Sequence, residues 1–298
     1  MILLTGATGL VGTAVLQRLV AARRPVRCLV RDPRGLGELR VRVQLALGDL
    51  ADPPSFRNAM RGVTTVIHLA GSARDQPAGS IEELNGIATW RMVRAAERAG
   101  VQRFVFLSGL GASPHHRARL LRAKSLAEEV VAASTLETAI VATSLVYGPD
   151  DRTQRLLRRL LLGAPVLPVI GRGTSEFQPL WAADVAECLL AVLDRDVPHQ
   201  RHELAGPDIL TAREMGDLRL RALGKRRRDL SIPEPVVAGG LRIGENLLKS
   251  KTPVCWDEVE LLTASMTTKH GSAGTEALGV RPAPMREVLA PVQHRGHV

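Results

Sequence analysis

The first half of the chain alternates two patterns of apolar residues. Short runs rich in β-branched residues predict strands, and stretches with apolar residues every three or four positions predict helices. The predicted strands are Ile2–Thr5, Val26–Arg31, Val41–Leu47, Val63–Ala70, Arg103–Ser108 and Glu137–Thr143. The predicted helices are Leu10–Ala22, Pro54–Arg61, Ile81–Ala99 and Leu120–Ala133. This alternation predicts an α/β fold with a doubly wound parallel sheet, covered by helices on both faces.

The alternation loosens after Tyr147. Helices are still predicted at Arg152–Leu162 and Ala183–Leu193, but prolines, glycines and short helical stretches dominate the last hundred residues. We therefore expect a first domain over residues 1–147, whose sheet later segments can complete. Residues 148–298 are expected to form a smaller C-terminal lobe.

The chain is strongly basic, with a formal net charge of +10 at pH 7. Most of this excess is arginine and is spread along the sequence, and Lys225–Arg228 is the one continuous run of cations. Proteins that recognise nucleic acid usually add stacking aromatics or a recognisable module, and aromatic residues make up only 3% of this chain. We expect no specific nucleic-acid binding and interpret the run as exposed surface.

The cysteines and the longest apolar stretch bear on location. Cys28, Cys188 and Cys255 are far apart and odd in number, without metal-ligand spacing, which is typical of structural thiols in a reducing compartment. Prolines interrupt the longest apolar stretch, so no transmembrane segment is predicted. The first strand begins at once, which leaves no room for a signal peptide. We expect a cytoplasmic protein without a metal site.

The most specific motif is the glycine-rich stretch Thr5–Gly12. Gly6, Gly9 and Gly12 form G-x-x-G-x-x-G directly after a predicted strand and before a predicted helix. The first glycine allows a tight turn, the second lets a pyrophosphate approach the backbone, and the third lets the helix pack closely on the strand. Free N–H groups at the start of the helix would face the phosphates. The loop therefore predicts a nicotinamide-dinucleotide site.

Further motifs extend this pattern over most of the chain. They are Gly48-Asp49-Leu50, His68-Leu69-Ala70-Gly71, Asn85, Phe104–Ser108, Trp181–Ala186 and Leu278–Pro282. Together with the glycine loop they resemble the extended and atypical branch of the short-chain dehydrogenase/reductase superfamily. That branch includes sugar epimerases, NmrA-like proteins, isoflavone-type reductases and an accessory subunit of respiratory complex I.

The resemblance implies a set of cofactor-binding positions. They are Gly6, Thr8, Gly9, Leu10, Val11, Gly12, Arg31, Asp32, Asp49, Leu50, Ala70, Gly71, Ser108, Lys124 and Leu145. In the family, the residue at Asp49 contacts the adenine edge, and those at Ala70 and Gly71 lie near the ribose.

Two adjacent residues bear on the choice between NAD and NADP. Arg31 ends the second predicted strand, where the ribose is read, and Asp32 follows it. An acid there accepts hydrogen bonds from the 2′-OH and favours NAD, whereas an arginine can grip a 2′-phosphate and favours NADP. In the family, Val30–Pro33 usually accompanies NADP. We expect NADP, with NAD the alternative. A third interpretation gives neither residue a role in cofactor choice: Arg31 is simply solvated, and Asp32 caps the following turn.

The usual catalytic pair of the superfamily is incomplete. Its reductases use Tyr-x-x-x-Lys on the helix after the fifth strand, where the tyrosine transfers the substrate proton and the lysine binds the nicotinamide ribose. Lys124 is in place, but Leu120 stands at the tyrosine position, and the single tyrosine, Tyr147, follows the next strand. Loss of a positioned general acid costs a factor of about 10²–10⁴ in rate. Ordinary ketone reduction is therefore disfavoured.

Two functions remain. The first is an NAD(P)H-dependent oxidoreductase or epimerase-like enzyme on an unknown small molecule, in which Lys124 is the catalytic proton-transfer group. The second is a non-catalytic cofactor-binding protein that senses redox state or belongs to an assembly. Leu120 favours the second. We expect a monomer or a homodimer.

Overall fold

A computed structural model describes the chain apart from residues 149–150, 152–153, 156–165, 196–198, 249–253 and 291–298. Its centre is a seven-stranded sheet in the order β11-β6-β5-β4-β1-β2-β3, and every neighbouring pair is parallel. The strands are β1 (Ile2–Thr5), β2 (Val26–Val30), β3 (Gln44–Leu47), β4 (Thr65–His68), β5 (Arg103–Gly109), β6 (Glu137–Thr143) and β11 (Gln200–Leu204). The predicted parallel α/β sheet is confirmed.

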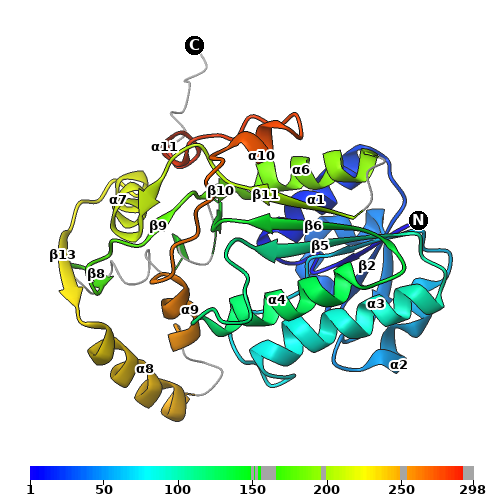
Figure 1. Cartoon of the computed structure of the whole chain (residues 1–298), viewed down its shortest axis with the longest axis horizontal. Helices are drawn as coiled ribbons and strands as arrows, with labels where there is room; N and C mark the ends of the chain where they lie inside the picture. The colour runs from blue at the N-terminus through cyan, green and yellow to red at the C-terminus, as the bar shows by residue number, and fades with distance from the viewer. Residues whose placement is uncertain (149–150, 152–153, 156–165, 196–198, 249–253, 291–298) are drawn as a thin grey trace.

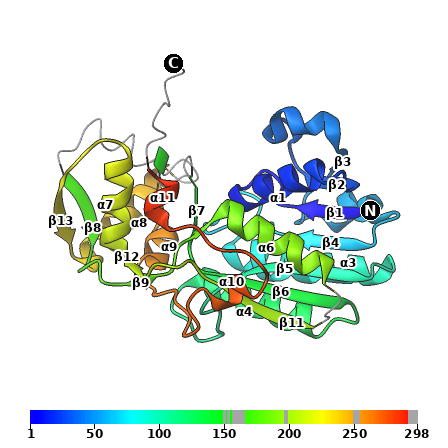
Figure 2. The ribbon, with the colours of Figure 1, turned by 90° about the horizontal axis from the view of Figure 1, so that it is seen from above.

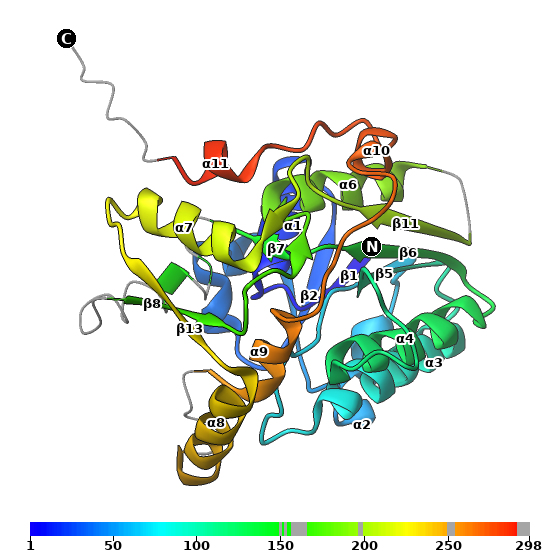
Figure 3. The same ribbon diagram turned by 60° about the vertical axis from the view of Figure 1, so that its left-hand side comes forward.

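Helices cover both faces of this sheet (Figure 1). α1 (Leu10–Ala21) and α6 (Ala182–Asp194) pack on one face, and α3 (Ala88–Arg98) and α4 (Arg119–Ala132) pack on the other. The short α2 (Pro53–Phe56) and the following 3₁₀ turn η2 (Arg57–Met60) lie beside α3, as Figure 3 shows. Both layers are held by buried apolar side chains, so the core is continuous from helix to sheet to helix.

Two segments differ from the sequence expectation. The predicted strand Val41–Leu47 begins only at Gln44, because a 3₁₀ segment η1 (Pro33–Arg42) precedes it. Val41 is 81% exposed, so this apolar side chain does not mark a buried strand position. The predicted helix Ile81–Ala99 contains a π-helical turn, η3 (Glu83–Ile87), directly before α3.

Residues from the second half complete the first domain. β11 pairs with β6, and α6 packs on α1, so the sheet is finished by segments beyond Tyr147. The predicted helix Ala183–Leu193 corresponds closely to α6, whereas most of the predicted helix Arg152–Leu162 lies outside the described residues.

The remaining segments form a smaller lobe beside the carboxyl end of the sheet (Figure 2). Its strands are β7 (Val146–Tyr147), β8 (Val166–Ile170), β9 (Glu176–Phe177), β10 (Leu180–Trp181), β12 (Leu210–Thr211) and β13 (Arg228–Ile232), which pair two by two. Its helices are α7 (Ala212–Ala222), α8 (Glu234–Leu248), α9 (Trp256–Leu261) and α11 (Met285–Val288). The short α10 (Ala273–Glu276) lies instead against β11 of the central sheet (Figure 2).

Two features hold the lobe together. Tyr147, Phe177 and Met285 share one apolar cluster. The guanidinium of Arg219 donates to both carboxylate oxygens of Asp151, each at 2.9 Å, and both side chains are buried. Among the described helices, none is long and apolar enough to cross a membrane.

Candidate functional site

The glycine loop between β1 and α1 is built by close backbone contacts. Gly6 has φ +71°, and a Cβ placed on it would lie 2.7 Å from the nitrogen of Ala70. A Cβ on Gly12 would lie 2.0 Å from the carbonyl oxygen of Gly6. Gly9 donates its N–H to that same oxygen at 2.9 Å and is the N-cap of α1 without a side-chain cap. The turn therefore presents the uncapped N-terminus of a twelve-residue helix.

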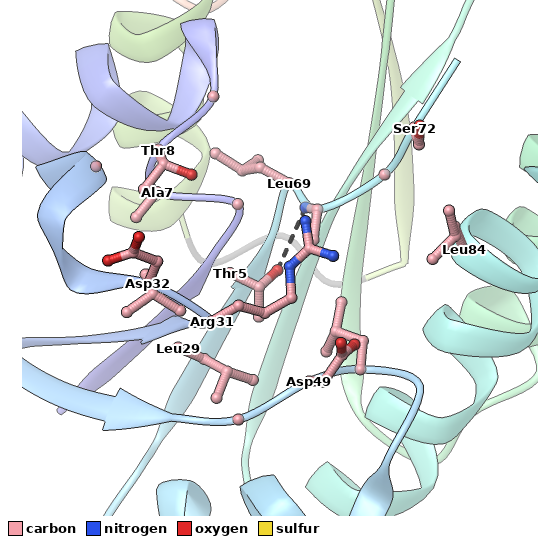
Figure 4. A pocket seen from close by; sticks show the side chains of 18 of the residues that line it. Thr5, Ala7, Thr8, Leu29, Arg31, Asp32, Asp49, Leu69, Ser72 and Leu84 are labelled. Carbon is pink, nitrogen blue, oxygen red and sulfur yellow. Dashed lines mark hydrogen bonds between the residues drawn. The ribbon is translucent and has the colours of Figure 1, made fainter. Parts of the chain in front are cut away.

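A cavity of about 410 Å³ opens beside this loop (Figure 4). Of the predicted cofactor-binding residues, its wall contains Gly6, Thr8, Gly9, Arg31, Asp32, Asp49, Leu50, Ala70 and Gly71. These come from the carboxyl ends of β1, β2, β3 and β4, where parallel sheets of this kind bind ligands. Leu10, Val11, Gly12, Ser108, Lys124 and Leu145 do not line it. Val11 and Gly12 are buried and serve the packing of α1.

Arg31 and Asp32 lie side by side on the rim but have different partners. Both carboxylate oxygens of Asp32 bind the Arg34 guanidinium, at distances between 2.7 and 3.0 Å, and one also accepts the Arg34 N–H. These hydrogen bonds lower the pKa of Asp32. The Arg31 guanidinium lies 3.5 Å from Gln76 Oε1 and has no carboxylate partner in the described part of the chain.

The loop after β3 is tied in place by its own polar groups. Asp49 accepts the N–H of Ala51 at 2.9 Å and donates its own N–H to Ser55 Oγ at 2.9 Å. Arg91 on α3 donates to the carbonyl oxygen of Ala51 at 2.9 Å. These hydrogen bonds therefore hold in place the part of the cavity wall that Asp49 and Leu50 form.

The predicted catalytic lysine lies past the far end of the cavity. Lys124 Nζ donates to the carbonyl oxygen of Leu107 at 2.7 Å and stands 4.7 Å from the centre of the Phe106 ring. A Cβ placed on Gly71 would lie 3.5 Å from that Nζ and 2.4 Å from Asn85 Oδ1. Burial lowers the pKa of Lys124 to about 8. The ammonium thus lies at the end of the cavity wall, next to Gly71.

The hydroxyl of Ser108 lies near the end of β5, where the lobe packs on the sheet. Ser108 is buried, and its hydroxyl has no hydrogen-bond partner among the described residues. A Cβ placed on neighbouring Gly109 would lie 2.9 Å from Leu121 Cδ2 and 3.6 Å from Met266 Cε, so the lobe packs against the end of β5. Tyr147 is fully buried, and burial raises its pKa. It lies in the lobe's apolar cluster.

Leu145, the last predicted position, is partly buried against that same cluster. Its carbonyl oxygen accepts the N–H of Leu180 at 2.9 Å. Of the predicted positions outside the cavity, Leu10, Val11 and Gly12 lie in α1, and Ser108, Lys124 and Leu145 lie in or beyond β5.

The loop after β4 contributes residues that the sequence analysis did not assign. Ser72, Gln76 and Leu84 line the cavity. Asn85, noted only as part of the family pattern, donates to the carbonyl oxygens of Ser72 and Ile81, each at 2.8 Å. No motif of the sequence marks Ser72 or Gln76 as ligand-facing, and Asn85 lies in the π-helical turn η3 beyond this loop.

An ionic cluster joins this loop to α4 and to α9 in the lobe. Arg119 contacts Glu82 at 2.7 Å, Asp75 at 3.1 Å and Asp257 at 3.4 Å. Arg74 binds Glu258 through both of its carboxylate oxygens. We call these six residues the arginine clasp. It fastens the lobe to the first domain beside the start of α4.

Comparisons with known proteins agree with this geometry. A sequence profile described as NAD(P)H-binding matches residues 6–196. A mitochondrial protein of Arabidopsis thaliana, NADH dehydrogenase [ubiquinone] 1 alpha subcomplex subunit 9, is 31% identical over 258 residues. That alignment covers 83% of this chain and 64% of the plant protein. The chain therefore spans less than two thirds of this relative.

Two further proteins widen the comparison. An NAD(P)H azoreductase of Xenophilus azovorans is 27% identical, with 78% of this chain and 77% of the azoreductase covered. The solved structure of UDP-glucose 4-epimerase from Thermus thermophilus, in complex with NAD, superposes with a TM-score of 0.72. It covers 97% of both chains at 18% identity, which is a likeness of fold.

Proposed function

The chain belongs to the NAD(P)H-binding family, within the atypical short-chain dehydrogenases/reductases, and from that premise we propose that it holds NADP(H) without reducing ketones by the tyrosine mechanism. The glycine loop would bind the pyrophosphate, Asp49 and Leu50 would flank the adenine, and Lys124 would reach the nicotinamide ribose. The nicotinamide ring, when bound, supplies or accepts a hydride. The fit is supported by the nine predicted cofactor-binding positions that line one cavity beside the glycine loop.

The preference for NADP rests on how the two rim residues are engaged. Both carboxylate oxygens of Asp32 already accept hydrogen bonds from the exposed Arg34 guanidinium, so a 2′-OH would compete with that ion pair. Arg31 is exposed and lacks a carboxylate partner in the described part of the chain, so its guanidinium is available to a 2′-phosphate. A guanidinium binds phosphate through two parallel hydrogen bonds, which favours the phosphorylated cofactor.

The observation that carries the non-catalytic proposal is Leu120. An aliphatic side chain there can neither give nor take a proton, and Tyr147 is fully buried in the lobe. The plant relative is named as a subunit of NADH dehydrogenase. In this proposal the bound dinucleotide has a structural role.

A second candidate is a reductase that depends on Lys124. Its lowered pKa, about 8, would let the ammonium give up a proton near neutral pH. The azoreductase relative is named for an activity that uses NAD(P)H.

One comparison separates the two candidates. Wild type, Lys124→Arg and Leu120→Tyr are assayed with NADPH against ketones, enones, azo dyes and sugar nucleotides, and cofactor binding is measured by calorimetry. We expect dinucleotide binding without turnover, and Lys124→Arg should change affinity only. Turnover by the wild type that falls about 10²–10⁴-fold in Lys124→Arg would instead establish the reductase.

A further inference from the structure

Residues of α2, η2 and α3 line a second groove on the first domain. Figure 3 shows α2 beside α3. Its volume is about 660 Å³, and its wall shares no residue with the dinucleotide cavity. Met60, Ala95 and Pro53 give it an apolar surface, and the indole of Trp90 stands beside them. Trp90 is 49% exposed, which is unusual for so large an apolar side chain. We call this the Trp90 groove.

Four arginines surround the indole. They are Arg57 from η2 and Arg91, Arg94 and Arg98 from α3. On α3 the arginines recur at intervals of three and four residues, so they share one face of the helix.

Their charge is mostly uncompensated. Arg94 pairs with Glu97 at 2.9 Å, and Arg91 donates to the backbone carbonyl of Ala51. Arg57 and Arg98 are exposed and have no hydrogen-bond or ionic partner among the described residues. Two guanidinium groups are therefore available to an incoming anion.

The combination of groups selects the ligand. Guanidinium forks bind phosphate oxygens through paired hydrogen bonds. An exposed indole stacks on the flat face of a nucleobase. A second copy of the chain is a poor occupant, because a symmetric contact would bring two sets of arginines against each other.

We propose that the Trp90 groove binds a nucleoside polyphosphate, with the base stacked on Trp90 and the phosphates held by Arg57 and Arg98. This site is separate from the dinucleotide cavity. Arg91 connects the two, since it lines the groove and also holds the loop that follows Asp49 and Leu50.

The test uses ATP as the probe, titrated into the full chain with and without saturating NADP⁺. Calorimetry gives the stoichiometry, and Trp fluorescence reports stacking on the indole. We expect one ATP per chain that NADP⁺ does not displace, with quenching of the Trp90 emission. Trp90→Ala, and separately the pair Arg57→Ala with Arg98→Ala, should each raise the Kd about tenfold or more.

The matched control removes two exposed cations elsewhere, Lys225→Ala with Arg226→Ala in the lobe, and should leave the Kd within about twofold. All altered side chains are exposed, and thermal denaturation checks that each variant is folded. Five results would each overturn the proposal. The first two are that ATP does not bind at all, or that NADP⁺ fully displaces it. The others are an equal loss of affinity in the control pair, binding of tripolyphosphate as tight as that of ATP, and a dimer in sedimentation that shields Trp90 from a quencher. Binding of oligothymidylate in place of ATP would assign the groove to nucleic acid instead.

Discussion

Arg31 and Asp32 are adjacent in the chain, yet only one of them is available to a ligand. Because Asp32 is held by Arg34, Arg31 should determine the choice of cofactor. We predict that the wild type binds NADPH about ten- to a hundredfold more tightly than NADH, which corresponds to the free energy of a charge-assisted contact. Arg31→Ala should weaken NADPH and leave NADH nearly unchanged in calorimetric titrations, and Arg40→Ala is the matched exposed control. An equal loss for both cofactors would show that Arg31 does not contact the phosphate.

Lys124 leads to a prediction about protons. Its pKa is lowered to about 8, and the negative charge of a bound dinucleotide should raise it again. Between the two pKa values the complex holds a proton that the free protein lacks, so binding at about pH 8.5 should take up a proton and affinity should fall as pH rises through this range. Calorimetry in buffers of different ionisation enthalpy measures this uptake.

The matched variant for this measurement is Lys124→Met. It should bind without proton uptake, because no titrating amine remains beside the ribose. Uptake that persists in Lys124→Met would assign the proton to another group. His68 is a poor candidate, since burial lowers its pKa to about 3.

The site was predictable where the backbone itself makes the contact. The spacing of the three glycines was enough to predict the loop between β1 and α1. At Gly6 and Gly12 only glycine avoids a clash with a neighbouring backbone atom. The roles of Gln76 and Asn85 were not predictable, since they depend on how a loop without a motif folds back over β4. Arg31 lies between these cases. Its place at the end of β2 could be predicted from the sequence. That Asp32 pairs with Arg34 and not with Arg31 could not, because it depends on how the following turn folds.

At the scale of elements, the buried pair of Asp151 and Arg219 ties the segment after β7 to α7. Asp151 also accepts the N–H of Gln154 at 2.8 Å, so its carboxylate hydrogen-bonds both to the Arg219 guanidinium and to the backbone. We predict that Arg219→Leu lowers the free energy of unfolding by about 3–5 kcal/mol, because it leaves a buried carboxylate without its cation. Chemical denaturation measures the loss. The double variant Asp151→Leu with Arg219→Leu should recover much of it, and no recovery would mean that Arg219 acts through packing alone.

Most elements of the first domain followed from apolar periodicity, since α1, α4 and β6 begin and end within one residue of the predicted bounds. The exceptions have local causes. Pro33 and the cap by Asp32 start a 3₁₀ segment where an apolar run predicted a strand. The lobe was less readable because its strands, such as β7 and β9, have only two residues and pair with distant segments.

At the scale of the whole molecule, the arginine clasp governs how the lobe sits on the first domain. Arg119 lowers the pKa of Glu82 to about 2. A carboxyl group with a lowered pKa gives stability that is present above its pKa in the unfolded chain, near 4.5, and is lost as pH falls toward 2.

We predict that Arg74→Gln with Arg119→Gln increases hydrogen exchange in α9 while α1 stays protected. The control pair Arg40→Gln with Arg42→Gln should change neither helix, and unchanged exchange in α9 would show that apolar packing alone fastens the lobe.

The late origin of β11 has a consequence for synthesis. The strand that closes the sheet beside β6 leaves the ribosome some sixty residues after β6 itself, by the spacing of Thr143 and Leu204. Until then the nascent chain carries an open edge of seven residues, most of them apolar and later buried. Unpaired edges of this kind are templates for association with other chains. The growing polypeptide is therefore most vulnerable while the lobe is being translated, and a ribosomal pause between Thr143 and Gln200 would prolong that exposure.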